Sequence, residues 1–240
     1  ETTGFQSTRA SNPTRDRLET LIAGLEEGTD AIAFSSGMAA VDAVFHLFSP
    51  GDHVILGDDL YGGSIRLFTN IYEKNGVEFT YVGTSDLDAV QAAFKPNTKA
   101  VYIETPTNPM MEITDVRALS KMAHDRNALV IVDNTFLSPY FQKPLNLGAD
   151  IVVHSGTKFI GGHHDVISGF TIVKDDELAA QLRLIYKTVG ACLSAFDSWL
   201  VIRGVKTLAL RMEQHQKNAI ALAEWLKKQP KVTKVLFPGL

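Results

Sequence analysis

The chain has 240 residues and a formal net charge of −4 at pH 7. Hydrophobic residues make up 45% of it and charged residues 21%, which is ordinary for a globular protein and excludes disorder over most of the chain. The acidic balance argues against a nucleic-acid-binding protein, and no apolar run reaches the roughly 20 residues that span a bilayer. The single cysteine, Cys192, cannot form an intrachain disulfide, and the first residues lack the pattern of a signal peptide. We therefore expect a reducing, cytoplasmic location.

Seven short apolar runs recur along the chain and predict β-strands. They are Ala31–Phe34, His53–Leu56, Glu78–Val82, Ala100–Ile103, Leu129–Val132, Ile151–Val153 and Gly169–Val173. Stretches with helical spacing lie between most of these runs, for example Leu18–Leu25, Val41–Phe48 and Val116–Met122. Because several runs are apolar throughout, the alternation predicts an α/β fold of three layers (α/β/α), with a mostly parallel central sheet between helices.

The last part of the chain has a different pattern. From about Ala195 to Lys228 the sequence predicts one long helix, and Lys231–Phe237 predicts a strand. A long helix followed by one strand is typical of the start of a second domain. We expect an N-terminal arm at residues 1–15, a large domain at 16–205, and at 206–240 a connecting helix with the start of a truncated C-terminal domain.

Ligands bind beyond the carboxyl ends of the strands in sheets of this kind, so the residues after each run are candidate site residues. The first run is followed by a turn of small residues and then by a predicted helix with Gly37 and Met38 at its start. Free N–H groups at a helix N-terminus favour a phosphate. A plain tight turn is an equally good interpretation of this segment alone.

Two further strand ends carry reactive groups. Asp133 follows the fifth run and either caps a turn or holds a carboxylate toward a cationic ring nitrogen. The sixth run leads to Lys158, in an apolar and glycine-rich setting that suits a Schiff-base amine, although most lysines lie on the surface. The hydroxyls of Ser155 and Thr157 are placed to face one phosphate. An anion site, an acid and then a lysine 25 residues later form the layout that a pyridoxal phosphate enzyme needs.

These segments together resemble the Cys/Met-metabolism family of fold-type I pyridoxal phosphate enzymes. The family includes cystathionine β-lyase, cystathionine γ-lyase, cystathionine γ-synthase and methionine γ-lyase, and the resemblance implies their aspartate-aminotransferase-like large domain. The matching motifs extend over essentially the whole chain and are Arg9–Arg15, Leu60–Gly63, Glu104–Pro109, Asp133–Thr135, Leu147–Asp150, Ser155–Lys158, Ser194–Trp199 and Arg203–Leu208.

The resemblance also implies a role for each site residue. Lys158 is expected to bind the cofactor as an imine and then to carry a proton, while Asp133 pairs with the pyridinium nitrogen. Tyr61 is expected to stack on the ring and to assist proton transfer, and Glu104 is expected to line the substrate pocket. The other implied cofactor-binding residues are Gly37, Met38, Ser155, Thr157, Thr135 and Asn108.

The N-terminal segment is expected to act in a second subunit. Within the family the residue matching Arg9 binds the phosphate of a neighbouring subunit, so the resemblance implies at least a homodimer, and the family is usually a tetramer. Two positions depart from the family pattern. Ser7 stands in the substrate pocket where a tyrosine is usual, which leaves the substrate preference open. Gly63 stands where methionine γ-lyases typically carry a cysteine, which disfavours that activity.

The implied activity is the cleavage of a carbon–sulfur bond in a small sulfur amino acid. A slight similarity of Gly57–Ser64 and His154–Asp165 to β-lyases puts cystathionine β-lyase first, with homocysteine, pyruvate and ammonia as products. Cystathionine γ-lyase and cystathionine γ-synthase stay open, followed by methionine γ-lyase and by a non-catalytic paralogue or fragment. No metal site is predicted, because the adjacent His163, His164 and Asp165 lack the spacing with which side chains bind one ion.

Overall fold

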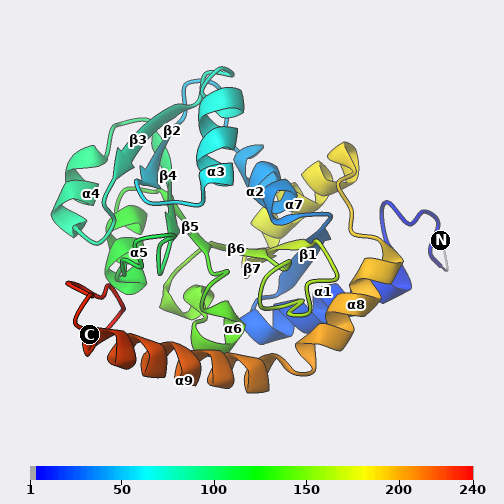
Figure 1. Ribbon diagram of the computed structural model, residues 1–240. Coiled ribbons are helices and arrows are strands. Elements are labelled where there is room, and N and C mark those ends of the chain that lie inside the picture. Colours follow the sequence, from blue (N-terminus) through cyan, green and yellow to red (C-terminus); the bar gives the residue numbers. More distant parts are fainter. Residues whose placement is uncertain (1–3, 240) are drawn as a thin grey trace.

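The computed structural model describes residues 4–239, and its centre is one seven-stranded sheet with the order β1-β7-β6-β5-β4-β2-β3 (Figure 1). All seven strands coincide with the predicted apolar runs, so this part of the prediction is confirmed. The strands are β1 (Asp30–Phe34), β2 (His53–Gly57), β3 (Glu78–Val82), β4 (Thr98–Glu104), β5 (Leu129–Asp133), β6 (Ile151–Ser155) and β7 (Gly169–Val173).

The sheet is mostly parallel, as predicted. Strands β3, β2, β4, β5 and β6 pair in parallel, whereas β7 is antiparallel to both of its neighbours, β1 and β6. The register places Glu104 at the end of β4 beside Asp133 at the end of β5, and Asp133 beside Val153 of β6. The carboxyl ends of these three strands therefore meet at one edge of the sheet.

Helices cover both faces of the sheet. They are α1 (Pro13–Glu26), α2 (Gly37–Phe45), α3 (Gly62–Leu67), α4 (Leu87–Ala93), α5 (Val116–His124), α6 (Ser138–Phe141), α7 (Asp176–Val189), α8 (Ala195–Val205) and α9 (Leu208–Lys227), with a π-helical turn η1 (Phe68–Tyr72) and a 3-10 turn η2 (Pro144–Leu147). On one face α1, α5 and α8 bury Leu18, Leu119 and Val201 against the strands. On the other face α2 and α7 bury Val44 and Leu182. These two cores make the predicted three layers.

Two predictions for the C-terminal part are wrong. The stretch from Ala195 to Lys228 is two helices, because α8 ends at Val205 and α9 begins at Leu208. The side chain of Arg211 donates to the Gly204 carbonyl at 2.9 Å and so binds the free end of α8. Lys231–Phe237 forms no strand within residues 4–239, because a strand needs a paired neighbour and this segment has none there.

Helix α9 runs along the outside of the molecule, past α6, and leads to the C-terminal end (Figure 1). It leaves large apolar side chains exposed, among them Leu210, Leu222 and Trp225. At the other end of the chain α1 begins at Pro13, so residues 13–15 of the predicted arm lie in this helix. No helix within residues 4–239 combines the length and the apolar character needed to cross a bilayer.

Candidate active site

A cavity of about 220 Å³ lies where the carboxyl ends of β4, β5 and β6 meet the start of α2. Most of the site residues predicted from the sequence line this cavity: Gly37, Met38, Tyr61, Glu104, Asn108, Asp133, Thr135, Ser155, Thr157 and Lys158. Five lining residues had no predicted role, namely Ser36, Val41, Ser64, Phe136 and Ile167. Three of these are apolar, and an apolar residue in a sequence is normally predicted to lie in the core. The sequence therefore carries no signal that distinguishes these three from core residues.

One wall of the cavity is the first turn of α2. The hydroxyl of Ser36 caps this helix by accepting a hydrogen bond from the Ala39 N–H at 3.0 Å. The N–H groups of Gly37 and Met38 precede the first intrahelical hydrogen bond and are free for an anion. A Cβ atom at Gly37 would lie 2.8 Å from the Cβ atom of Ser155, so only glycine lets the helix start this close to the end of β6.

The opposite wall carries the buried carboxylate of Asp133. Its Oδ1 accepts hydrogen bonds from the Thr135 N–H at 3.0 Å and the Thr135 hydroxyl at 2.5 Å, and its Oδ2 accepts from the Tyr102 hydroxyl at 3.4 Å. Thr135 Oγ1 also accepts from the Ser155 N–H at 2.8 Å, which ties the end of β5 to that of β6. Burial raises the pKa of Asp133, and the Thr135 hydrogen bonds oppose this shift.

Glu104 is a second carboxyl group in the cavity. Its Oε2 accepts a hydrogen bond from the Tyr61 N–H at 2.9 Å. Burial, helped by the neighbouring charge of Asp133, raises the pKa of Glu104 to about 8. The Tyr61 ring is 46% exposed and lies against Gly63, where a Cβ atom would come within 2.3 Å of Tyr61 Cε1. Glu104 and Gly63 therefore fix the backbone and the ring of Tyr61 at the cavity.

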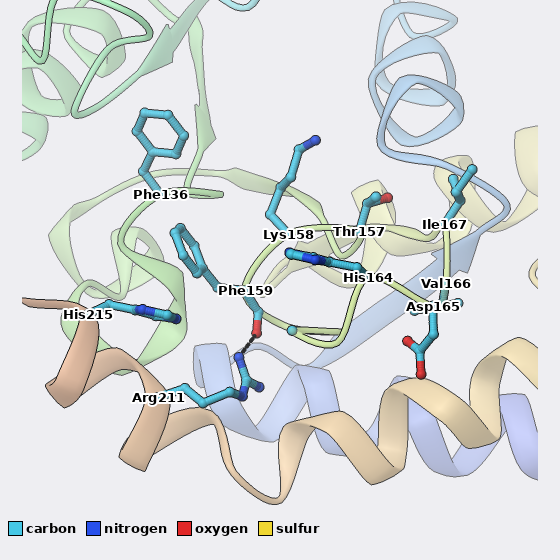
Figure 2. A pocket seen from close by; sticks show the side chains of 11 residues that line it. Phe136, Thr157, Lys158, Phe159, His164, Asp165, Val166, Ile167, Arg211 and His215 are labelled. Carbon is cyan, nitrogen blue, oxygen red and sulfur yellow. Dashed lines mark hydrogen bonds between the residues drawn. The ribbon is translucent and has the colours of Figure 1, made fainter.

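Lys158 lies in a tight loop after β6. Its N–H donates to the Ser155 carbonyl at 3.3 Å, and its carbonyl accepts from the Gly162 N–H at 2.8 Å. Figure 2 shows its side chain extending away from Arg211 and His215. The Thr157 hydroxyl donates to the Ser168 carbonyl at 3.2 Å and accepts from the Ser168 N–H at 3.1 Å, so a phosphate would compete with this pair for the hydroxyl.

A larger cavity of about 750 Å³ adjoins the first and shares Lys158 with it (Figure 2). Its polar lining comes from the loop after Lys158 and from α9. Arg211 lines this cavity, but its guanidinium donates to the Phe159 carbonyl at 2.6 Å and to the Gly204 carbonyl at 2.9 Å. The one arginine among its lining residues is therefore engaged with the backbone.

His163 and His164 are adjacent in the loop that follows Lys158. His164 and Asp165 line the larger cavity, while Nδ1 of His163 lies 2.8 Å from the Gly161 carbonyl oxygen. Within residues 4–239 no three histidine, cysteine, aspartate or glutamate side chains form a group that could hold a metal ion.

The structure does not bring two predicted site residues into either cavity. Ser7 and Arg9 lie in the segment before α1, where the carbonyl of Ser7 accepts hydrogen bonds from the N–H groups of Ala10 and Ser11 at 3.0 Å. The guanidinium of Arg9 donates to the carbonyl of Lys187, near the end of α7. The contact of Arg9 with a cofactor phosphate that the resemblance implies is therefore not made in the cavities of its own chain.

The donor set of the smaller cavity fits pyridoxal phosphate. A buried carboxylate held by Thr135 suits a pyridinium N–H, which would supply the positive charge that burial of Asp133 otherwise lacks. The N–H groups at the start of α2 and the hydroxyl of Ser155 suit the phosphate, and the amine of Lys158 suits the aldehyde. These groups lie around one space, as a single bound molecule requires.

Comparisons with known proteins agree with this assignment. The family model described as "Cys/Met metabolism PLP-dependent enzyme" matches residues 1–240. The chain is 50% identical over 236 residues to the cystathionine beta-lyase of Lactococcus lactis, covering 98% of this chain and 62% of that protein. It is 52% identical over 240 residues to the cystathionine gamma-synthase of Haemophilus influenzae, covering 100% of this chain and 65% of that protein.

A solved structure gives the same result for the fold. The cystathionine gamma-lyase from Lactobacillus plantarum, crystallised with L-serine, superimposes with a TM-score of 0.97 at 49% identity, over 98% of this chain and 62% of that one. The chain thus spans less than two thirds of the length of these relatives. The match over the whole chain, together with the cavity, shows that this chain belongs to the Cys/Met-metabolism family of pyridoxal-phosphate-dependent enzymes.

Proposed function

We propose that the protein is a pyridoxal-phosphate-dependent carbon–sulfur lyase that cleaves cystathionine by β-elimination. The observation that carries this proposal is the convergence of the Lys158 amine, the Asp133 carboxylate and the Tyr61 ring on one cavity. The overall reaction converts cystathionine and water into homocysteine, pyruvate and ammonia. It requires removal of the α-proton of the substrate and departure of the sulfur from the β-carbon.

The residues of the cavity have separate tasks in this reaction. When bound, pyridoxal phosphate supplies an electron sink for the negative charge that develops at the α-carbon. Asp133 would keep the ring nitrogen protonated, since Thr135 holds its carboxylate by two hydrogen bonds where it lines the cavity. Lys158 would hold the aldehyde group of the cofactor through Nζ, and the same Nζ would take the α-proton of the substrate. Tyr61 lines the cavity with a partly exposed ring, and its phenol would exchange a proton during the reaction.

Sequence resemblance supports β-elimination over the related reactions. The segments Gly57–Ser64 and His154–Asp165 are similar to β-lyases, and the lactococcal relative at 50% identity carries that name. Methionine γ-lyase activity is disfavoured by Gly63, since a side chain there would displace the Tyr61 ring from its present position. γ-Replacement is the second candidate, favoured by the 52% identity to the Haemophilus cystathionine gamma-synthase.

We propose further that the active unit is at least a dimer. Arg9 lies outside the cavities of its own chain, on a segment anchored at Lys187 near the end of α7, and a phosphate-binding arginine in this position acts on a neighbouring subunit. Arg9→Ala is expected to weaken pyridoxal phosphate binding without changing the sedimentation behaviour of the protein. An unchanged dissociation constant for the cofactor would contradict this assignment.

The decisive experiment identifies the keto acid formed from cystathionine alone by the purified protein loaded with pyridoxal phosphate. Pyruvate with homocysteine supports the proposal, whereas 2-oxobutyrate with cysteine replaces it with γ-elimination. If neither keto acid forms while the protein absorbs as an imine, the assay is repeated with an activated homoserine and cysteine, and formation of cystathionine establishes γ-replacement. A protein that does not bind the cofactor supports the non-catalytic alternative.

A further inference from the structure

A buried polar network lies behind the site, on the reverse face of the sheet. Side chains alternate between the two faces of a strand, so Asp133 and Ser155 face the cavity while their neighbours Asn134 and His154 face the opposite side, toward α1. There they meet Glu26, in the last turn of α1. Side chains from strands β5 and β6 thus converge on one helix directly behind the cavity.

The contacts in this network are short and fully buried. Glu26 Oε1 lies 2.5 Å from His154 Nε2 and accepts a second hydrogen bond from Asn134 Nδ2 at 2.9 Å. The side chains of His154 and Glu26 are 1% and 0% exposed. Within residues 4–239 the second oxygen of Glu26 and Nδ1 of His154 have no hydrogen-bond partner. A buried polar pair with unpartnered atoms makes the fold less stable than apolar packing would, so stability alone does not explain why Glu26 and His154 lie there.

The network also reaches the third strand of the site. Asn134 Nδ2 donates to the Gln142 carbonyl at 2.8 Å, and Gln142 Nε2 donates to Asn134 Oδ1 at 3.0 Å and to the Thr105 carbonyl at 3.4 Å. Thr105 directly follows Glu104 at the end of β4. The network therefore links the carboxyl ends of β4, β5 and β6, and several of its members are chain neighbours of the cavity residues Glu104, Asp133, Thr135 and Ser155.

We propose that Glu26, His154 and Asn134 are positioning residues for the cofactor site. Hydrogen bonds have a preferred direction, whereas apolar contacts allow side chains to slide past one another. The network therefore fixes the positions, relative to one another, of the strand ends that carry the cofactor-binding groups. The proposal rests on the proposed cofactor site, and it assigns no contact with the cofactor to these three residues. It follows that a substitution of Glu26, at the end of α1 and 128 residues before His154, alters the affinity for the cofactor.

The test compares two buried histidines of the same sheet. His154→Leu removes the hydrogen bond to Glu26, and His154→Gln keeps a donor near the position of Nε2. The control is His53→Leu, because His53 is equally buried and lies 2.7 Å from Thr98 and 2.9 Å from Thr80, but at the opposite, amino end of β2. For each protein the dissociation constant of pyridoxal phosphate is measured by absorbance titration, beside the Tm of the cofactor-free protein.

We expect both leucine variants to lower the Tm, but only His154→Leu to weaken pyridoxal phosphate binding, by about tenfold or more, the size typical of losing a group that orients a ligand-binding residue. His154→Gln should restore most of the affinity. If His154→Leu does not fold, Glu26→Met replaces it, because methionine keeps the length of the side chain but removes the acceptor for His154 and Asn134; a several-fold weaker affinity supports the proposal.

Three results overturn the inference. The first is wild-type affinity in a folded His154→Leu or Glu26→Met variant. The second is an equal loss of affinity in His53→Leu, which would make the effect a general consequence of lower stability. The third is a His154→Gln variant as weak as His154→Leu. Failure of the wild-type protein itself to bind pyridoxal phosphate would instead overturn the proposed function.

Discussion

The two cavities that meet at Lys158 differ in how their charged groups are used. In the larger cavity, on the side of α9, the guanidinium of Arg211 is engaged with two backbone carbonyls. In the smaller cavity, on the side of α2, Asp133 and Glu104 are buried, and burial raises the pKa of both carboxyl groups. Arg211 is thus held by the backbone, whereas a positively charged ligand would offset the cost of ionising the two buried carboxyl groups.

The volume of a cavity is therefore a poor guide to its chemistry in this molecule. The larger cavity has about 750 Å³ against about 220 Å³, yet groups matched to a cofactor surround the smaller one. Perturbed carboxyl groups beside a candidate nucleophile mark a functional site better than volume does. Variants of residues in the smaller cavity, each paired with a control in the larger one, test this difference; Lys158 is the exception because it lines both cavities.

The largest expected effect is that of Lys158→Ala. Removal of the amine should abolish the absorbance of the imine and lower kcat by a factor of about 10² to 10⁴, the contribution of a positioned acid–base group. The absorbance spectrum and steady-state kinetics measure both effects. His215→Ala in the larger cavity is the control, with a kcat expected within about threefold of wild type, and a larger loss there would show that both cavities serve the reaction.

The next effect is that of Asp133→Asn. An amide keeps the shape but cannot stabilise a protonated ring nitrogen, so kcat should fall by about 10² to 10³, in the range found when a charge-stabilising group is lost from an active site. The matched control is Asp165→Asn, which removes an exposed carboxylate from the larger cavity. Equal effects of the two variants on kcat would contradict the assignment of the cofactor to the smaller cavity.

The raised pKa of Glu104 predicts that the stability of the cofactor-free protein depends on pH. Its folded pKa of about 8 exceeds the usual value of 4.5, so its contribution is complete below pH 4.5 and is lost as the pH rises toward 8. Glu104→Gln should remove the part of the pH dependence that Glu104 causes, which amounts to a change in the free energy of unfolding on the order of a few kcal/mol between pH 4.5 and pH 8. Urea unfolding from pH 5 to pH 9 measures it, with the exposed Glu112→Gln as control. An unchanged slope in Glu104→Gln would place its pKa near the usual value.

Much of the fold follows from local pattern. Central strands such as β5 are visible in the sequence because both faces of the strand are buried, so Leu129–Val132 is apolar at every position. The break between α8 and α9 is not visible, because residues 195–228 contain few helix breakers; in the structure the Arg211 side chain donates to the Gly204 carbonyl across the break. The segment Lys231–Phe237 has the composition of a strand, yet composition supplies no pairing partner.

The site is predictable only in part from spacing. Asp133 and Lys158 stand out as strand-end residues, whereas Tyr61 and Asn108 were assigned by family resemblance. Phe136 and Ile167 line the cavity without any polar signal. Glu26 and His154 are 128 positions apart in the sequence, and no local pattern predicts that they pair. What escapes the sequence is therefore side-chain contact between elements that only the fold brings together.

The smallest expected effect is that of Arg211→Lys, and it tests the comparison from the other side. A lysine cannot donate to both carbonyls as the planar guanidinium does, so the free energy of unfolding should fall by about 1 to 3 kcal/mol. The dissociation constant of pyridoxal phosphate should stay within about twofold of wild type, because Arg211 lines only the larger cavity. Denaturant unfolding and cofactor titration measure the two quantities, with the exposed Arg203→Lys as control. A tenfold loss of cofactor affinity in Arg211→Lys would mean that the loop from Lys158 to Gly162 transmits strain between the cavities, and the two would then have to be treated as one site.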